Sequence, residues 1–130
     1  MKQSIANITL LVDDYDKAIA FYTKKMDFDL VEDSDLGNGK RWVRIAPKAG
    51  NGCCLLLAKA VGEAQLKSIG NQAGGRVFLF LFTDDIERDY KKMKYNAIEF
   101  TREPSKEIYG TVAVFKDVYG NLWDLIEAAH

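Results

Sequence analysis

The sequence predicts an α+β fold in which two β-α-β-β-β modules form curved mixed sheets around a shared cleft. The first observation behind this prediction is an internal repeat: residues 12–26 and 83–93 both carry an Asp-Asp pair, a later tyrosine and a final Lys-Lys-Met. The second is that apolar, strand-like runs precede and follow each copy. The third is length, because 130 residues with 48% hydrophobic content supply the core of one compact domain. Self-similarity over about half of the chain indicates two copies of one unit.

The first module is predicted over residues 4–58. Residues 5–12 form an apolar run with β-branched residues, which favours a strand, and the side chain of Asp13 then offers an oxygen that caps a helix. Apolar residues at helical spacing place that helix over residues 15–26. Turns rich in glycine and asparagine separate the remaining strands of this module, at residues 28–31, 40–46 and 53–58. A linker follows at residues 59–75 and includes a short helical turn.

The second module is predicted over residues 76–128. A strand at residues 76–82 leads into a helix that Asp84 caps, with Glu87 completing a capping box. We expect this helix to be about one turn shorter than its counterpart, because its Lys-Lys-Met lies closer to the Asp-Asp pair. Pro104 is expected to end the next strand in a loop. The remaining strands are predicted at residues 98–102, 111–115 and 121–127.

Composition and charge exclude several classes of function. Lys and Arg number 18 against 19 Asp and Glu, a net charge of −1, which disfavours nucleic acid as a partner. The uncharged apolar runs are shorter than the roughly 18–20 residues of a membrane span, and the N-terminus shows no signal peptide, so no membrane partner and a cytoplasmic location are expected. Cys53 and Cys54 are adjacent, which disfavours a disulfide between them and favours two small reduced side chains.

The strand at residues 76–82 alternates aliphatic and aromatic residues. With a side-chain period of two, Phe78, Phe80 and Phe82 share one face, and the aliphatic residues take the face that suits the helix. The three phenylalanines are therefore either plain sheet core or the wall of an apolar pocket. We favour the pocket because the helix already covers the other face.

Four further residues are candidates for a binding site. Trp42 and Arg44 share one face of their strand, where they either suit an aromatic or carboxylate-bearing ligand or form a surface pair. Asp124 lies in an apolar strand, where it orients a ligand, acts as a general base, or pairs with Arg44 or Arg76. Tyr109 follows the long loop, from which its phenol either reaches over the mouth of the cleft or stays in an exposed turn.

A set of short segments carries a likeness that covers nearly the whole chain. These segments are residues 8–14, 20–22 and 28, the strand that leads into Thr83 and, above all, residues 115–127. The pattern resembles the vicinal oxygen chelate superfamily, also called the glyoxalase/bleomycin-resistance/dioxygenase family. Residues 115–127 are similar to the closing hairpin of that family, in which a turn feeds a strand that bears an acidic metal ligand.

Family enzymes usually hold a divalent metal on His or Glu side chains of the first and fourth strand of each module. Of the residues at those positions here, Asp124 alone is a good metal ligand, and the sole histidine, His130, is the last residue. We therefore expect no metal ligands and no cofactor, with a divalent metal as the less favoured alternative. The positions that the resemblance implies are Asn7, Leu56, Phe78 and Asp124.

Two functional hypotheses follow. The favoured one is a protein, similar to the bleomycin-resistance branch, that binds a small, partly aromatic or apolar organic molecule in the cleft between the modules without a metal. The alternative is a divergent metal-dependent glyoxalase-like lyase, isomerase or dioxygenase that uses Asp124. The resemblance also implies a homodimer. The residues expected to line the ligand site are Asn7, Trp42, Arg44, Leu56, Phe78, Phe80, Phe82, Tyr109 and Asp124.

Overall fold

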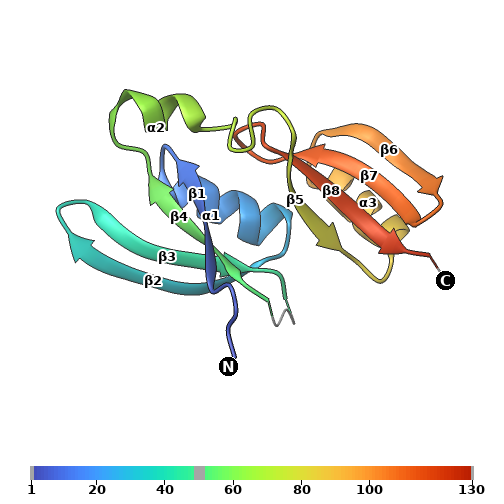
Figure 1. The fold of residues 1–130 in the computed structure, drawn as a ribbon, viewed down its shortest axis with the longest axis horizontal. Coiled ribbons are helices and arrows are strands. Elements are labelled where there is room, and N and C mark those ends of the chain that lie inside the picture. The colour runs from blue at the N-terminus through green and yellow to red at the C-terminus, as the bar shows by residue number, and fades with distance from the viewer. Residues whose placement is uncertain (1, 49–51, 130) are drawn as a thin grey trace. The chain divides into compact units, whose positions relative to one another are not determined.

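The computed structural model describes residues 2–48 and 52–129, which form two four-stranded sheets, each with a helix packed against it (Figure 1). Residue contacts divide the chain into two compact units between Ile69 and Gly70, and we call the β-α-β-β-β module in each the first and the second module. The turn expected after Ala46 includes residues 49–51, which lie outside the described residues, as does His130.

The order of elements confirms the predicted α+β fold with two β-α-β-β-β modules. The first module consists of β1 (Asn7–Val12), α1 (Tyr15–Ala20) continued by the π-helix η1 (Phe21–Lys25), β2 (Asp29–Gly37), β3 (Lys40–Ala46) and β4 (Cys54–Lys59). Helix α2 (Gly62–Ser68) follows in the predicted linker. The second module consists of β5 (Val77–Phe82), α3 (Ile86–Tyr95), β6 (Phe100–Glu107), β7 (Gly110–Lys116) and β8 (Leu122–Ala128).

Both sheets have the same strand order, so the repeat in the sequence is a repeat in topology. The orders are β1-β4-β3-β2 and β5-β8-β7-β6. In each sheet the first strand of the module runs parallel to the last, and the other neighbours are antiparallel. The last strand of each module is therefore central, while the first and second strands form the two edges.

Each module buries one face of its sheet under its own helix. In the second module this core is a chain of aromatic rings: the centroids of Tyr90 and Phe100 lie 4.7 Å apart, those of Phe100 and Phe115 5.6 Å, and those of Phe115 and Trp123 5.7 Å. Such ring pairs contribute about 0.5–1.5 kcal/mol each beyond the burial of their area. The largest fully buried side chains of the first module are those of Tyr22, Leu10, Ile45, Leu57, Val12 and Val43.

The N-cap of the first module's helix lies one residue later than predicted. Asp14, not Asp13, is the N-cap, since its Oδ1 accepts the backbone N–H of Asp16 at 2.8 Å and of Lys17 at 3.2 Å. The predicted difference of one turn between the helices is wrong, because α1 and η1, of 6 and 5 residues, together nearly match the 10 residues of α3. The two Lys-Lys-Met stretches are thus not equivalent positions.

The cap of α3 is shifted in the same way. Asp85, not Asp84, is the N-cap, and its Oδ1 accepts the N–H of Arg88 at 3.1 Å. A capping box needs Glu or Gln three residues after the cap, and Arg88 holds that position, so the prediction for Glu87 is wrong. In the described part of the chain, no helix is long and apolar enough to cross a membrane.

Strands β2 and β6 are both longer than predicted. Strand β2 continues to Gly37, because its polar second half pairs with β3 as far as Lys40. Strand β6 continues through Pro104, which the sequence placed in a loop. It does so because β6 is an edge strand, where a missing N–H is tolerated, and because its register with β7 shifts between Arg102 and Ser105.

Candidate functional site

The face of the second sheet that turns away from α3 carries exposed aromatic residues, and we call it the opposite face of the second module. Phe80 and Phe82 of β5 are the register partners of Asp124 and Ile126 of β8. Phe80 is 60% exposed and Phe82 76% exposed, whereas Leu125, between their partners, is fully buried on the α3 side. The alternation predicted from the sequence therefore places two phenylalanines side by side on the surface of the second module.

Asp124 is the acidic group of this face. It is partly buried, and this burial raises the pKa of its carboxyl, while the charge of Arg102 acts in the opposite direction. Its register partner on β7 is Val114, which in turn pairs with Arg102 on β6. Arg102 is engaged elsewhere, since it donates to Ser105 at 2.6 Å and to Glu107. Within residues 2–48 and 52–129 the Asp124 carboxylate forms no ion pair, so its oxygens are available as acceptors.

Phe78 and Tyr109 lie near the two opposite ends of the second sheet. Phe78 is partly buried at the register shift between Val77 and Leu79. Tyr109 is exposed in the turn between β6 and β7, and its carbonyl oxygen accepts the N–H of Ala129 at 3.2 Å. That turn lies at the same end of the sheet as Phe82. The roles proposed for both residues remain predictions.

In the first module, Trp42 and Arg44 lie on the face of the sheet away from α1 and share one partner. The Glu32 carboxylate accepts Trp42 Nε1–H at 3.1 Å and Arg44 Nε–H at 2.9 Å. Arg44 also lies 3.4 Å from Cys54 Sγ through Nη1. The hydrogen bond to Glu32 raises the pKa of Arg44. Sequence reasoning missed Glu32 because it ended β2 at Val31, one residue short of this partner.

Asn7 and Leu56 lie on this same face of the first module. Asn7 is the register partner of Cys54, and Leu56 lies between Thr9 and Arg44. Asn7 Oδ1 is buried and has no hydrogen-bond partner in the part of the chain that the structure describes. This face of the first module therefore carries one unsatisfied amide oxygen and one aliphatic side chain in addition to Glu32, Trp42 and Arg44.

The residues at the superfamily's metal positions do not fit a metal centre. Leu56 and Phe78 offer no donor atom, which leaves one amide and the Asp124 carboxylate. Glu127 cannot help Asp124, because its Oε1 accepts the N–H of Ile86 at 2.9 Å on the α3 side. Among the described residues, no group of three or more His, Cys, Asp or Glu is placed to hold a metal ion.

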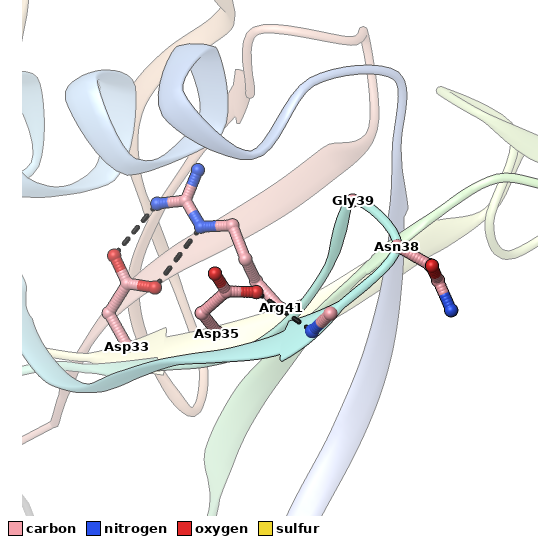
Figure 2. A pocket seen from close by; sticks show the side chains of 6 residues that line it. Asp33, Asp35, Asn38, Gly39 and Arg41 are labelled. Carbon is pink, nitrogen blue, oxygen red and sulfur yellow. Dashed lines mark hydrogen bonds and ion pairs between the residues drawn. The ribbon is translucent and has the colours of Figure 1, made fainter.

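A separate hollow of about 410 Å³ lies at the tip of the β2–β3 hairpin, lined by residues 33, 35, 37–39 and 41. Figure 2 shows two of the lining residues, Arg41 and Asp33, hydrogen-bonded to each other: Arg41 Nη2 donates to Oδ2 at 2.7 Å and Nε donates to Oδ1 at 3.1 Å. Arg41 Nη1 also donates to Asp16 of α1 at 3.0 Å, and its guanidinium lies 5.1 Å from the ring of Tyr15. Because these hydrogen bonds join β2 and α1, we infer that Arg41 has a structural role: it links the β2–β3 hairpin to α1.

Comparison with known protein families gives the identity of the fold. The model of the Glyoxalase/Bleomycin resistance protein/Dioxygenase superfamily matches residues 4–125. The chain belongs to this superfamily. Membership confirms the resemblance seen in the sequence, and it agrees with the paired β-α-β-β-β modules of the structure.

Two bacterial proteins match this chain over nearly their whole length. An uncharacterized protein of Shewanella frigidimarina (strain NCIMB 400) is 57% identical over 128 residues, which cover 98% of this chain and 95% of that protein. The uncharacterized protein YetH of Bacillus subtilis (strain 168) is 33% identical over 129 residues, covering 98% of this chain and 100% of that protein.

Two solved structures show the same architecture. UcmS2 has a TM-score of 0.85 and 29% identity, with 97% of this chain and 98% of that chain covered. TnmS3, an antibiotic binding protein from Streptomyces sp. CB03234, has a TM-score of 0.78 and 27% identity, with 99% of both chains covered. The solved structures similar to this chain thus include that of an antibiotic binding protein.

Proposed function

We propose that this superfamily member binds a small, partly aromatic or apolar organic molecule and does so without a metal. The observation that carries this proposal is the pair of exposed phenylalanines, Phe80 and Phe82, beside the partly buried carboxylate of Asp124. Neighbouring aromatic side chains at the surface of one strand offer a flat apolar area, and an adjacent acceptor fixes the orientation of a ligand that stacks there.

The chemistry of this face indicates which ligands suit it. An aromatic ring that stacks on Phe80 or Phe82 gains about 0.5–1.5 kcal/mol beyond area burial. Asp124 accepts a hydrogen bond from a ligand N–H or O–H, and a charge-assisted bond of this kind is about twice as strong as a neutral one. A neutral or cationic aromatic molecule with a donor group therefore suits the face better than an aromatic acid does.

The similarity to TnmS3 supports a binding function over catalysis. That protein is an antibiotic binding protein, and the alignment covers 99% of both chains at 27% identity. The donor set supports the same choice, because the metal positions of the superfamily hold Leu56 and Phe78 in this chain. For the first module taken by itself, we propose that Asn7, Trp42, Arg44 and Leu56 are the residues that contact a ligand.

Binding of N-phenyl-1-naphthylamine tests the proposal, since this neutral probe carries two aromatic groups and an N–H donor and fluoresces more strongly in apolar sites. We expect saturable binding to the wild type. Phe80→Ala and Phe82→Ala each remove a stacking surface and should weaken the affinity about tenfold, which corresponds to about 1.4 kcal/mol. Asp124→Asn should weaken it several-fold by replacing the charged acceptor.

Tyr95→Ala is the matched control, because Tyr95 is 90% exposed at the end of α3, on the other side of the sheet. Its loss should leave the affinity for the probe unchanged. Equal affinity in the wild type and in a Phe80→Ala/Phe82→Ala double variant would refute the proposal. An equal loss in Tyr95→Ala would show that the probe binds exposed aromatic residues without selectivity.

The same aromatic pair also suits the homodimer that the resemblance implies. Sedimentation equilibrium measures this directly: a homodimer has twice the chain mass of 14.6 kDa. If a second copy covers Phe82, Phe82→Lys should reduce the mass to that of one chain, while Tyr95→Lys should not. Wild-type affinity for the naphthylamine probe would then fall as the protein concentration rises.

A further inference from the structure

A second hollow, of about 140 Å³, lies in the second module, at the end of its sheet where β5 and β8 begin, away from Phe82 and Tyr109. Its walls come from residues 70–76, which precede β5, and from residues 116–122, which join β7 to β8. Arg76 and Lys116 are the charged residues among its lining, and both are cationic. Lys116 is the register partner of Leu122, two residues before Asp124, so the hollow is distinct from the aromatic pair.

Buried hydrogen bonds hold the two walls of this hollow together. Asp117 and Asn121 are 5% and 3% exposed, and Asn121 Nδ2–H donates to Asp117 Oδ2 at 2.9 Å. Asn121 Oδ1 accepts the N–H of Gln72 at 3.1 Å, which joins one wall to the other. Gly70 approaches the second wall so closely that a Cβ there would lie 2.1 Å from the carbonyl oxygen of Tyr119. The hollow is therefore a built feature and not a gap between mobile loops.

Asp117, the acidic residue in the turn that forms one wall of this hollow, already has hydrogen-bond donors for both carboxylate oxygens. Asp117 Oδ1 accepts the backbone N–H groups of Tyr119 and Asn121, each at 2.9 Å, while Oδ2 accepts Asn121 Nδ2–H. Hydrogen bonds from several N–H groups stabilise a carboxylate in place and leave fewer lone pairs to meet a ligand. Asp117 is also absent from the residues that line the hollow.

The two cations, in contrast, are available. Arg76 is exposed and forms no ion pair with the acidic side chains of the described residues. Lys116 Nζ lies 3.4 Å from Glu99 Oε2, but both side chains are substantially exposed, and exposed pairs of this kind contribute about 0–1 kcal/mol. A ligand that offers a second anion can therefore compete with Glu99 for Lys116.

We infer that this hollow binds a small oxyanion, either a carboxylate or a phosphate group of an organic molecule. A guanidinium presents paired N–H donors that match the oxygens of both groups, and an ammonium supplies a second positive charge. The volume suits one such group and not a drug-sized molecule, which requires about 300 Å³ or more. This inference stands independently of the proposed function, because it concerns other residues and another chemical class of ligand.

Amide NMR titrations with inorganic phosphate and with acetate, in chloride at constant ionic strength, test the inference. We expect saturable shifts for the amides of residues 70–76 and 116–122, with little change elsewhere. Tighter binding of phosphate would identify a phosphate site, and tighter binding of acetate a carboxylate site. Arg76→Gln and Lys116→Gln should each lower the affinity for the more tightly bound anion by about tenfold, since each removes one charged donor group.

Lys91→Gln is the matched control, because it makes the same change of charge at an exposed residue of α3. It should leave the affinity for the anion unchanged. The amide spectrum of each variant reports whether it is folded. The inference is wrong if the shifts do not saturate, if Arg76→Gln and Lys116→Gln bind as the wild type does, or if Lys91→Gln weakens binding equally.

Discussion

Asp124 lies beside two exposed phenylalanines and is itself partly buried, and this burial has a cost in stability. Burial raises the pKa of its carboxyl, so the ionised form is less stable in the folded chain than in the unfolded chain. This penalty is absent below the ordinary value of 3.8, where the carboxyl is protonated in both states, and it appears as the pH rises through the folded pKa.

We therefore predict that Asp124→Asn raises the free energy of unfolding at neutral pH, by less than about 1 kcal/mol. The gain should vanish as the pH falls below 3.8. Urea denaturation of wild type and variant across this pH range measures it. Glu103→Gln, the same change at an exposed residue of β6, should leave stability nearly unchanged. A loss of stability in Asp124→Asn at neutral pH would contradict the prediction.

At the level of single residues, sequence reasoning succeeded where the period of a strand decides the outcome. It placed Trp42 and Arg44 on one face, and Phe80 and Phe82 on another, because side chains on a strand alternate. It could not find Glu32 as the partner of Trp42 and Arg44, because that contact depends on the register between β2 and β3. The register depends on how two strands pair, so the sequence of one strand alone does not determine it.

Among the secondary-structure elements, α1 depends on one cap. Asp14→Ala removes the acceptor for the N–H groups of Asp16 and Lys17, and we predict a loss of about 1 kcal/mol in the free energy of unfolding. Asp13→Ala removes an exposed contact of 3.3 Å with Lys17, so it should cost a few tenths of a kcal/mol. Thermal and urea denaturation of both variants decide which residue is the cap. A larger loss in Asp13→Ala would show that the cap is Asp13.

The hairpin of β2 and β3 is tied to α1 through Arg41, which bonds both Asp33 and Asp16. We predict that Arg41→Met lowers the free energy of unfolding at neutral pH by about 1–2 kcal/mol, a modest value because the partners are partly exposed. The hydrogen bond from Arg41 lowers the pKa of Asp33, so this stabilisation is present above the ordinary value of 3.8. It should be lost as the pH falls below that value.

Urea denaturation of the wild type and Arg41→Met from neutral pH to strongly acidic pH tests this prediction. The difference between them should be constant above pH 3.8 and shrink below it. Lys48→Met is the control, since Lys48 pairs with Asp29 at 2.9 Å on the same hairpin but is far more exposed than Arg41. An equal loss of stability in Lys48→Met would mean that the Arg41 ion pairs contribute no more to the free energy of unfolding than an exposed pair does.

The sequence predicted the ends of helices and strands less well than the elements themselves. Strand β6 passes through Pro104 because it lies at the edge of its sheet, and an edge position depends on the order of all four strands. The predicted N-caps were wrong by one residue because each helix follows an Asp-Asp pair, and either aspartate of such a pair has the chemistry of a cap. Local sequence thus predicts the kind of element, while its ends depend on its neighbours.

For the whole molecule, the repeat was the most informative feature of the sequence. It predicted two modules of one topology, and both sheets have the same strand order and the same parallel pair. Short segments, residues 115–127 above all, also indicated the superfamily, which the family match over residues 4–125 confirms. Ligand chemistry was less accessible, because the anion-binding hollow depends on a contact between residues 70–76 and 116–122 that no local pattern encodes.

The division into two units leads to a prediction about cooperativity. Each module has its own helix and its own buried face, and Leu57 in β4 and Leu125 in β8 are fully buried at corresponding strands. Leu→Ala at such sites costs about 2–5 kcal/mol. We predict that Leu57→Ala speeds native-state hydrogen exchange in β1, β3 and β4 while leaving β5, β7 and β8 near wild-type protection, and that Leu125→Ala does the reverse.

Hydrogen exchange followed by mass spectrometry of peptides from each module measures both variants against the wild type. Because the same change is made at matched strands, each variant is the control for the other. Selective loss of protection in the altered module would mean that the repeat is also a repeat of folding units, each held by its own core. Equal loss in both modules would mean that the chain opens as one cooperative unit, and that the stability of either sheet depends on the other.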